Sequence, residues 1–151
     1  MDFLPWLHFA HVLAAIVWIG GGVMLMLIGV RARSGADPHA VTQFARIVPW
    51  VGIRALTPAV AVLLATGVWM VLANAAWSFS AFWVQLALGL FALAFLVGVV
   101  YMSRVGIQLD RVESSGDEQA SQLIDRWLIG YGVILLVLVV AVWDMVFKPA
   151  I

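Results

Sequence analysis

Four long apolar runs, separated by short polar segments, constrain what this chain can fold into. The runs cover residues 3–30, 50–73, 82–102 and 127–147. A helix needs about 20 apolar residues to cross a bilayer core of about 30 Å, and each run meets that length. The chain is 65% hydrophobic and 11% charged, whereas an ordinary soluble domain is about 45–50% apolar and about 25% charged. Residues 1–151 therefore predict one all-α domain, an integral membrane bundle of four helices.

The first apolar run is expected to persist as a membrane helix and not to be a cleaved signal peptide. No Lys or Arg precedes it, and it is longer than the apolar region of about 7–15 residues in such peptides. Pro5 suits the first turn of the helix, where a missing N–H costs least.

The positions of the charged residues predict the orientation. Every basic residue except Lys148 belongs to the side of the membrane that holds the two longer loops, 31–49 and 103–126. An excess of positive charge marks the cytoplasmic side, so both termini are expected outside a bacterial inner membrane that the chain crosses several times. Four tryptophans of the outer boundary would form an aromatic belt: Trp6, Trp77, Trp83 and Trp143. With a net charge of +0 and no basic patch, nucleic acid is excluded as a partner.

Prolines and glycines predict where the helices begin, bend and end. Residues 39–48 have a weakly amphipathic pattern and are expected to lie along the lipid headgroups, with Pro49 starting the second span. Pro58 removes a backbone donor and predicts a kink. The third helix is expected to run to about Val112, and a new helix to start near Asp117.

Two of the three histidines lie inside the first apolar run, where ionisable side chains usually have a function. At about 100° per residue, the residues His8, His11, Trp18 and Gly22 share one face of the helix. His8 and His11 lie on adjacent turns and could share one metal ion, but they cannot bind one haem from opposite sides. Haem would take one of them and a second ligand from elsewhere, or leave that position open. The alternative is that both are interfacial histidines bonded to carbonyls or water.

Three other polar residues are candidates for the same site. Asp144 and Lys148 stand four residues apart near the outer end of the last span and are expected to form an ion pair. In the alternative, Asp144 orients a ligating imidazole, and Lys148 binds a propionate or another anion. Arg54 is expected to reach headgroup phosphates, with a substrate or propionate contact as the alternative. The chain has no cysteine, which excludes disulfides and thiolate metal sites.

Five stretches carry a resemblance to a known group of proteins. They are Leu7-His8, Ala15-Ile16-Val17-Trp18-Ile19-Gly20-Gly21, Phe44-Ala45-Arg46, Leu64-Ala65-Thr66-Gly67-Val68 and Met145-Val146-Phe147-Lys148-Pro149. The chain resembles the copper-resistance-D-like superfamily of small integral membrane proteins, and most of all a four-span branch of predicted membrane proteins. Related groups include the haem-binding membrane protoporphyrinogen oxidases and the membrane domain of a cytochrome-linked urate oxidase. The resemblance implies His8 or His11 as an outer-leaflet ligand, with Trp18, Gly21 and Gly22 shaping the adjacent face.

Together these observations favour a membrane protein that binds b-type haem, or a related porphyrin, near its outer face for electron transfer or membrane redox chemistry. One alternative is copper or other metal-ion transport or resistance through His8 and His11. Another is a non-catalytic membrane subunit. The expected partners are the lipid bilayer, a second copy of the chain and a redox protein. The sequence contains no catalytic constellation and leaves open whether the protein is an enzyme.

Overall fold

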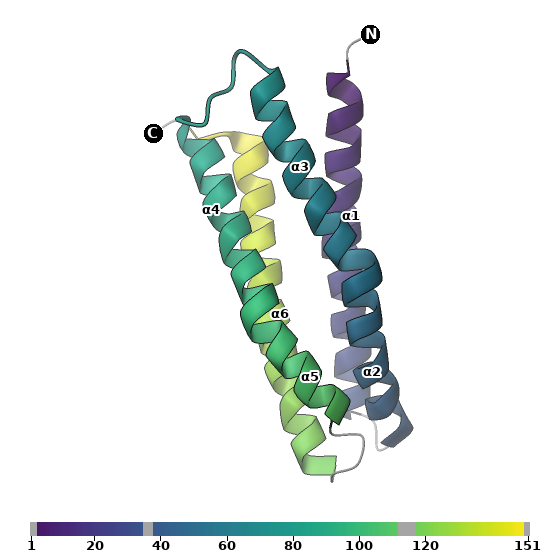
Figure 1. Cartoon of the computed structure of the whole chain (residues 1–151). Helices are drawn as coiled ribbons and strands as arrows, with labels where there is room; N and C mark the ends of the chain where they lie inside the picture. Colours follow the sequence, from purple (N-terminus) through teal and green to yellow (C-terminus); the bar gives the residue numbers. More distant parts are fainter. Residues whose placement is uncertain (1–2, 35–37, 112–116, 150–151) are drawn as a thin grey trace.

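The computed structural model describes residues 3–34, 38–111 and 117–149, and these residues form helices joined by short connections, with no strand among them. The α-helices are α1 (Leu4–Ser34), α2 (Pro38–Val51), α3 (Thr57–Ala73), α4 (Phe82–Leu96), α5 (Ser103–Arg111) and α6 (Asp117–Phe147). Two π-helical turns, η1 (Gly52–Leu56) and η2 (Val97–Met102), join α2 to α3 and α4 to α5. The predicted all-α bundle is confirmed (Figure 1).

Four continuous helical stretches are long and apolar enough to cross a membrane. They are Leu4–Ser34, His39–Ala73, Phe82–Leu109 and Ser121–Phe147. The first covers residues 4–30 of the predicted run 3–30, and the other three contain the predicted runs 50–73, 82–102 and 127–147. All four stretches extend beyond the runs, because the helices continue into the charged segments. The chain is therefore a multi-pass integral membrane protein.

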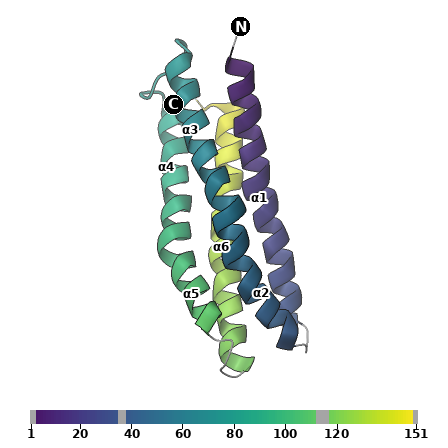
Figure 2. The same ribbon diagram turned by 45° about the vertical axis from the view of Figure 1, so that its right-hand side comes forward.

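The spans pack as two sequence-adjacent pairs. Helix α1 packs along α3, and α4 packs along α6, while the α1–α6 contact joins the two pairs. At the lower end in Figure 2, α2 also contacts α5 and α6. Helix α3 has no extensive contact with α4 or α6. Both termini lie at the opposite end, together with the loop at 74–81 (Figure 1). We call this the terminal end, and the end that carries Arg33, Arg104 and Arg126 the arginine end.

The core at the arginine end is aromatic. Phe44 of α2 is 0% exposed and meets Trp127 of α6 edge to face, with 5.2 Å between ring centroids. Trp127 in turn stacks on Tyr131 at 5.1 Å. The prediction that residues 39–48 lie along the headgroups is wrong, because their apolar face is buried in the bundle. Pro49 lies inside α2 and does not start a helix, since membrane helices tolerate the loss of one backbone hydrogen bond.

The backbone before Pro58 departs from α-helical geometry, as the sequence predicts. The departure is the π-helical turn η1, in which the Thr57 N–H bonds to the Gly52 carbonyl. The Thr57 hydroxyl donates to the same oxygen at 2.9 Å. Further along the chain, α6 begins at Asp117 as expected; Val112, the predicted end of the preceding helix, lies outside the described residues.

Candidate functional site

His8 lies one turn into α1 at the terminal end and is exposed. Its Nδ1 is 3.1 Å from the carbonyl oxygen of Leu4, an acceptor one turn earlier on the same helix. A carbonyl only accepts, so Nδ1 carries a proton, and in the neutral ring Nε2 is the nitrogen with the lone pair. The ring also meets Trp77 edge to face, with 5.9 Å between centroids.

His11 is held by a different helix. Its Nδ1 lies 3.0 Å from the hydroxyl oxygen of Thr66 on α3. That oxygen is also 2.6 Å from the carbonyl oxygen of Val62 and 3.2 Å from that of Leu63. Because the hydroxyl has one proton and gives it to a carbonyl, its oxygen accepts from His11 Nδ1–H. The tautomer of His11 is thereby fixed, with Nε2 unprotonated.

The His11 ring also packs closely against Gly67 of α3. A Cβ atom at this position would lie 3.1 Å from His11 Cε1, so a side chain here would push on the imidazole. The ring also interacts with the backbone of Leu63 on α3, and the His11 side chain is half-buried. The structure thus presents a half-buried imidazole that is held against α3 by Thr66, Leu63 and Gly67. Sequence reasoning did not single out Thr66 as a site residue; its only signal was the Leu64–Val68 run.

The two histidines do not assemble a larger ligand set. Each has its Nδ1 engaged separately, His8 by its own helix and His11 by α3. Over the described residues, no group of three or more His, Cys, Asp or Glu side chains is placed to hold a metal ion. A metal ion at this end would therefore find at most two such side chains together within the described residues.

Trp18, Gly21 and Gly22 pack within the bundle. A methyl group added at Gly22 would overlap the ring of Tyr131, whose hydroxyl donates to the Trp18 carbonyl at 3.4 Å. A Cβ at Gly21 would meet Leu56 at 3.1 Å. The Trp18 ring is buried and meets Phe91 at 5.9 Å between centroids. The space expected here for a cofactor is filled by protein side chains.

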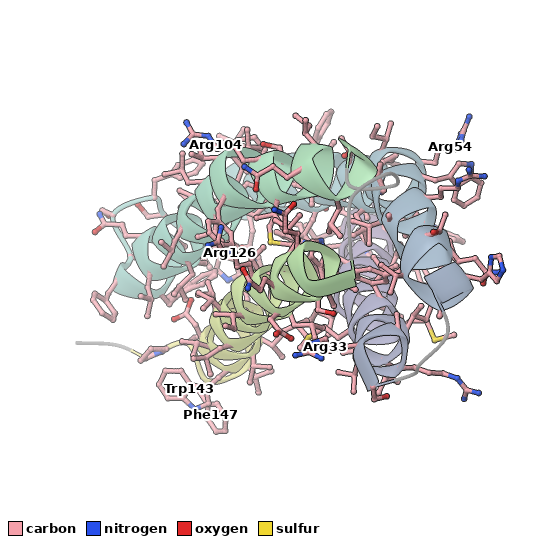
Figure 3. The ribbon with its side chains drawn as sticks, turned by 90° about the horizontal axis from the view of Figure 1, so that it is seen from below. Arg33, Arg54, Arg104, Arg126, Trp143 and Phe147 are labelled. Atoms are coloured by element: carbon pink, nitrogen blue, oxygen red, sulfur yellow. The ribbon has the colours of Figure 1, made fainter. Side chains whose placement is uncertain are left out.

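Arg54 lies apart from the histidines, in η1 toward the arginine end. Its side chain is exposed and extends over the ring of Trp50, 5.2 Å from the centroid. Figure 3 shows Arg54 at the periphery of the bundle, directed away from the other helices. This position suits contact with headgroup phosphates and not a shared site with His8 and His11.

The expected ion pair between Asp144 and Lys148 is not formed. The Lys148 ammonium lies over the rings of Trp77, at 4.4 Å, and Trp83, at 5.3 Å. Helix α6 ends at Phe147, and Lys148 has a left-handed backbone with φ of 43°. The i, i+4 spacing therefore does not place the two side chains on one helical face. Asp144 also makes no hydrogen bond to either histidine, as the orienting role would require.

Trp77 brings together residues from three parts of the chain. His8 of α1 meets its edge, Lys148 lies over its face, and Trp83 of α4 meets it at 5.3 Å. We call these four side chains the aromatic cap. It lies at the terminal end, where the sequence places Trp6 and Trp143 as well, and Figure 3 shows Trp143 projecting outward from α6.

Comparisons with known proteins give one finding. No curated protein and no solved structure matches the chain. Residues 5–149 match the family described as "Predicted integral membrane protein (DUF2269)". Because the match covers nearly the whole chain and all four spans, the protein belongs to this family.

Proposed function

We propose that this membrane protein binds b-type haem through Nε2 of His11 and takes part in electron transfer or membrane redox chemistry. The observation that carries the proposal is the His11–Thr66 hydrogen bond. A ligating histidine almost always donates its other ring N–H to a fixed acceptor, which sets both tautomer and ring orientation. Thr66 supplies that acceptor at 3.0 Å, and Nε2 is the ring nitrogen that would hold the iron.

The histidines of the described chain fit a haem with one axial protein ligand. His8 lies on the same helix as His11 and cannot approach from the opposite side. His39 is at the start of α2, near the arginine end. The haem would supply a one-electron carrier, and the role of the chain is to hold the imidazole in place.

Lys148 is the candidate for a propionate contact. It is the only lysine in the chain, and it lies at the terminal end on the same tryptophan as His8. A cation–π contact at an exposed site contributes about 0.5–1 kcal/mol, so a carboxylate can compete for the ammonium. The resemblance to haem-binding membrane oxidases also supports this proposal.

Copper capture is the second candidate. Both histidines have Nδ1 engaged by a hydrogen bond, so each has Nε2 available for a metal ion. The resemblance to copper-resistance proteins supports this function as well. It predicts that both histidines are required, whereas the haem proposal requires His11.

The visible spectrum and metal content of protein purified in detergent, after expression with ample haem, test these functions. The haem proposal predicts a Soret band that is lost in His11→Ala and retained in His8→Ala and in the control His39→Ala. A colourless protein, or a Soret band that survives in His11→Ala, would overturn it. Stoichiometric copper without porphyrin, lost in both His8→Ala and His11→Ala, would establish copper capture. Purified protein that carries neither haem nor copper would favour the remaining alternative, a non-catalytic membrane subunit.

We further propose that the arginine end faces the cytoplasm of a bacterial inner membrane. The basic residues at that end support this orientation. Because the chain has no cysteine, single cysteines report their side unambiguously. Ser78→Cys in the loop at 74–81 is expected to react with an impermeant maleimide on whole cells, and Ser34→Cys only after lysis. The reverse pattern would overturn the orientation.

A further inference from the structure

Asp144 is the buried charged residue of the terminal end. It lies one turn before the end of α6, inside the membrane-spanning stretch Ser121–Phe147, and is 0% exposed. Neither of its carboxyl oxygens has a hydrogen-bond partner within the described chain. Ionisable residues inside a span are rare and mark functional positions when they face the bundle.

The helices around Asp144 offer no bonded counter-charge. On its own chain segment, Lys148 is engaged by Trp77 and Trp83. On α1, the titratable groups near the terminal end are His8 and His11, whose Nδ1 atoms bond to Leu4 and Thr66, while Arg31 and Arg33 are in its last turn, at the arginine end. The helix α4 (Phe82–Leu96) contains no titratable side chain, and α2, α5 and η2 meet α6 toward the arginine end.

An isolated carboxylate in such surroundings is strongly disfavoured, because a charge removed from water needs a paired or hydrogen-bonded partner. A neutral carboxyl group avoids most of this cost. The unpartnered oxygens, the full burial and the engagement of Lys148 elsewhere are all explained if Asp144 carries a proton.

We propose that Asp144 is an intramembrane proton-binding site, which holds a proton at neutral pH and exchanges it with water at the terminal end. On release, the O–H bond of the carboxyl breaks, the proton passes to water, and the electron pair stays on the carboxylate. The ammonium of Lys148 then leaves Trp77 and Trp83 to pair with the carboxylate. The two residues are close in the backbone, where the Lys148 N–H donates to the Asp144 carbonyl at 2.8 Å, so the movement is one of the lysine side chain.

This proposal does not depend on haem or copper binding, and it is tested on the full-length protein without added cofactor. The measurement is the infrared C=O stretch of a protonated carboxyl group in proteoliposomes at neutral pH. The band is expected in wild-type protein, absent in Asp144→Asn and retained in Asp125→Asn. Asp125 is the matched control, because its side chain is half-exposed and pairs with Arg33, with 3.0 Å between Arg33 Nε and Asp125 Oδ1.

Two results would overturn the proposal: no such band in the wild type, or a band that persists in correctly folded Asp144→Asn. If Asp144→Asn does not fold, the presence or absence of the carboxyl band in the wild-type protein decides whether the proposal stands. On raising the pH, the band is expected to disappear together with a change in tryptophan emission as Lys148 leaves the aromatic cap. Lys148→Gln is expected to lose the emission change. Loss of the band without any emission change in the wild type would overturn the movement of Lys148.

Discussion

The Nδ1 atom of His11 lies 3.0 Å from the Thr66 hydroxyl oxygen, across a separation of 55 residues in the chain. The same hydroxyl is bonded back into its own helix at Val62. Toward His11 the Thr66 hydroxyl therefore acts only as an acceptor, which places an imidazole proton on Nδ1. This contact joins α1 to α3 at the terminal end, where α3 has no extensive contact with α4 or α6.

Thr66→Val removes that acceptor and nearly preserves the side-chain volume. Loss of the partner that orients a ligating histidine typically weakens metal binding by about 10–100-fold, and we expect a loss of this size for haem. A spectroscopic titration with haem measures it. Thr57→Val is the control, because the Thr57 hydroxyl bonds only within its own span, to Gly52. Wild-type affinity in Thr66→Val would contradict the role given to Thr66.

Gly67→Ala tests the seat of the His11 ring by crowding it. The added Cβ would lie 3.1 Å from His11 Cε1, so the imidazole must shift by a few tenths of an ångström. Mild overpacking lowers the free energy of unfolding by about 1 kcal/mol. We expect Gly67→Ala to weaken haem binding, as Thr66→Val does. Gly89→Ala, in α4, has nothing within 4 Å and should match the wild type in both stability and haem titration.

Gly22→Ala is expected to destabilise the bundle itself. The new methyl group would overlap the Tyr131 ring, and forcing such a contact costs about 1–3 kcal/mol. Unfolding in mixed micelles measures the change in the free energy of unfolding. Gly20→Ala on the same helix, with nothing within 4 Å, serves as the comparison. Adding Tyr131→Leu should recover part of the loss, and equal stability of the two alanine variants would contradict the packing role of Gly22.

Phe44→Ala tests whether α2 belongs to the bundle. Phe44 is 0% exposed against Trp127, and truncation of a buried Phe costs about 3–5 kcal/mol. Trp50 of the same helix is 57% exposed, and Trp50→Ala should change the free energy of unfolding by about 0.5 kcal/mol or less. Similar effects of both substitutions would indicate a helix lying on the membrane surface.

The four spans could be predicted because membrane crossing demands a length and an apolar composition that are both visible in the sequence. The position of α2 could not. Pro49 reads as a helix start by local rules, yet the helix continues through it because Phe44 and the residues around it gain burial against Trp127 and α5. The local preference for a helix start at Pro49 was overridden by the contact of Phe44 with Trp127, which lies 83 residues further along the chain (127 − 44).

The candidate site was predicted in part. His8 and His11 stand out as polar residues in an apolar run, but their partners depend on the rotation of α1 against α3, which no local pattern fixes. Thr66 looks like an ordinary small residue until that rotation is known. Asp144 and Lys148 have the spacing of a helical ion pair, but the helix ends between them at Phe147, and the left-handed backbone at Lys148 redirects the ammonium to Trp77.

The pairing of α1 with α3 and of α4 with α6 has a consequence for biogenesis. Each pair is a hairpin of spans that follow one another in the chain, so its main contacts can form as soon as its second span leaves the ribosome. The contacts between α6 and α1 and between α2 and α5 must wait for the last two spans. Insertion can therefore proceed as two successive hairpins, the second docking onto a first that is already closed.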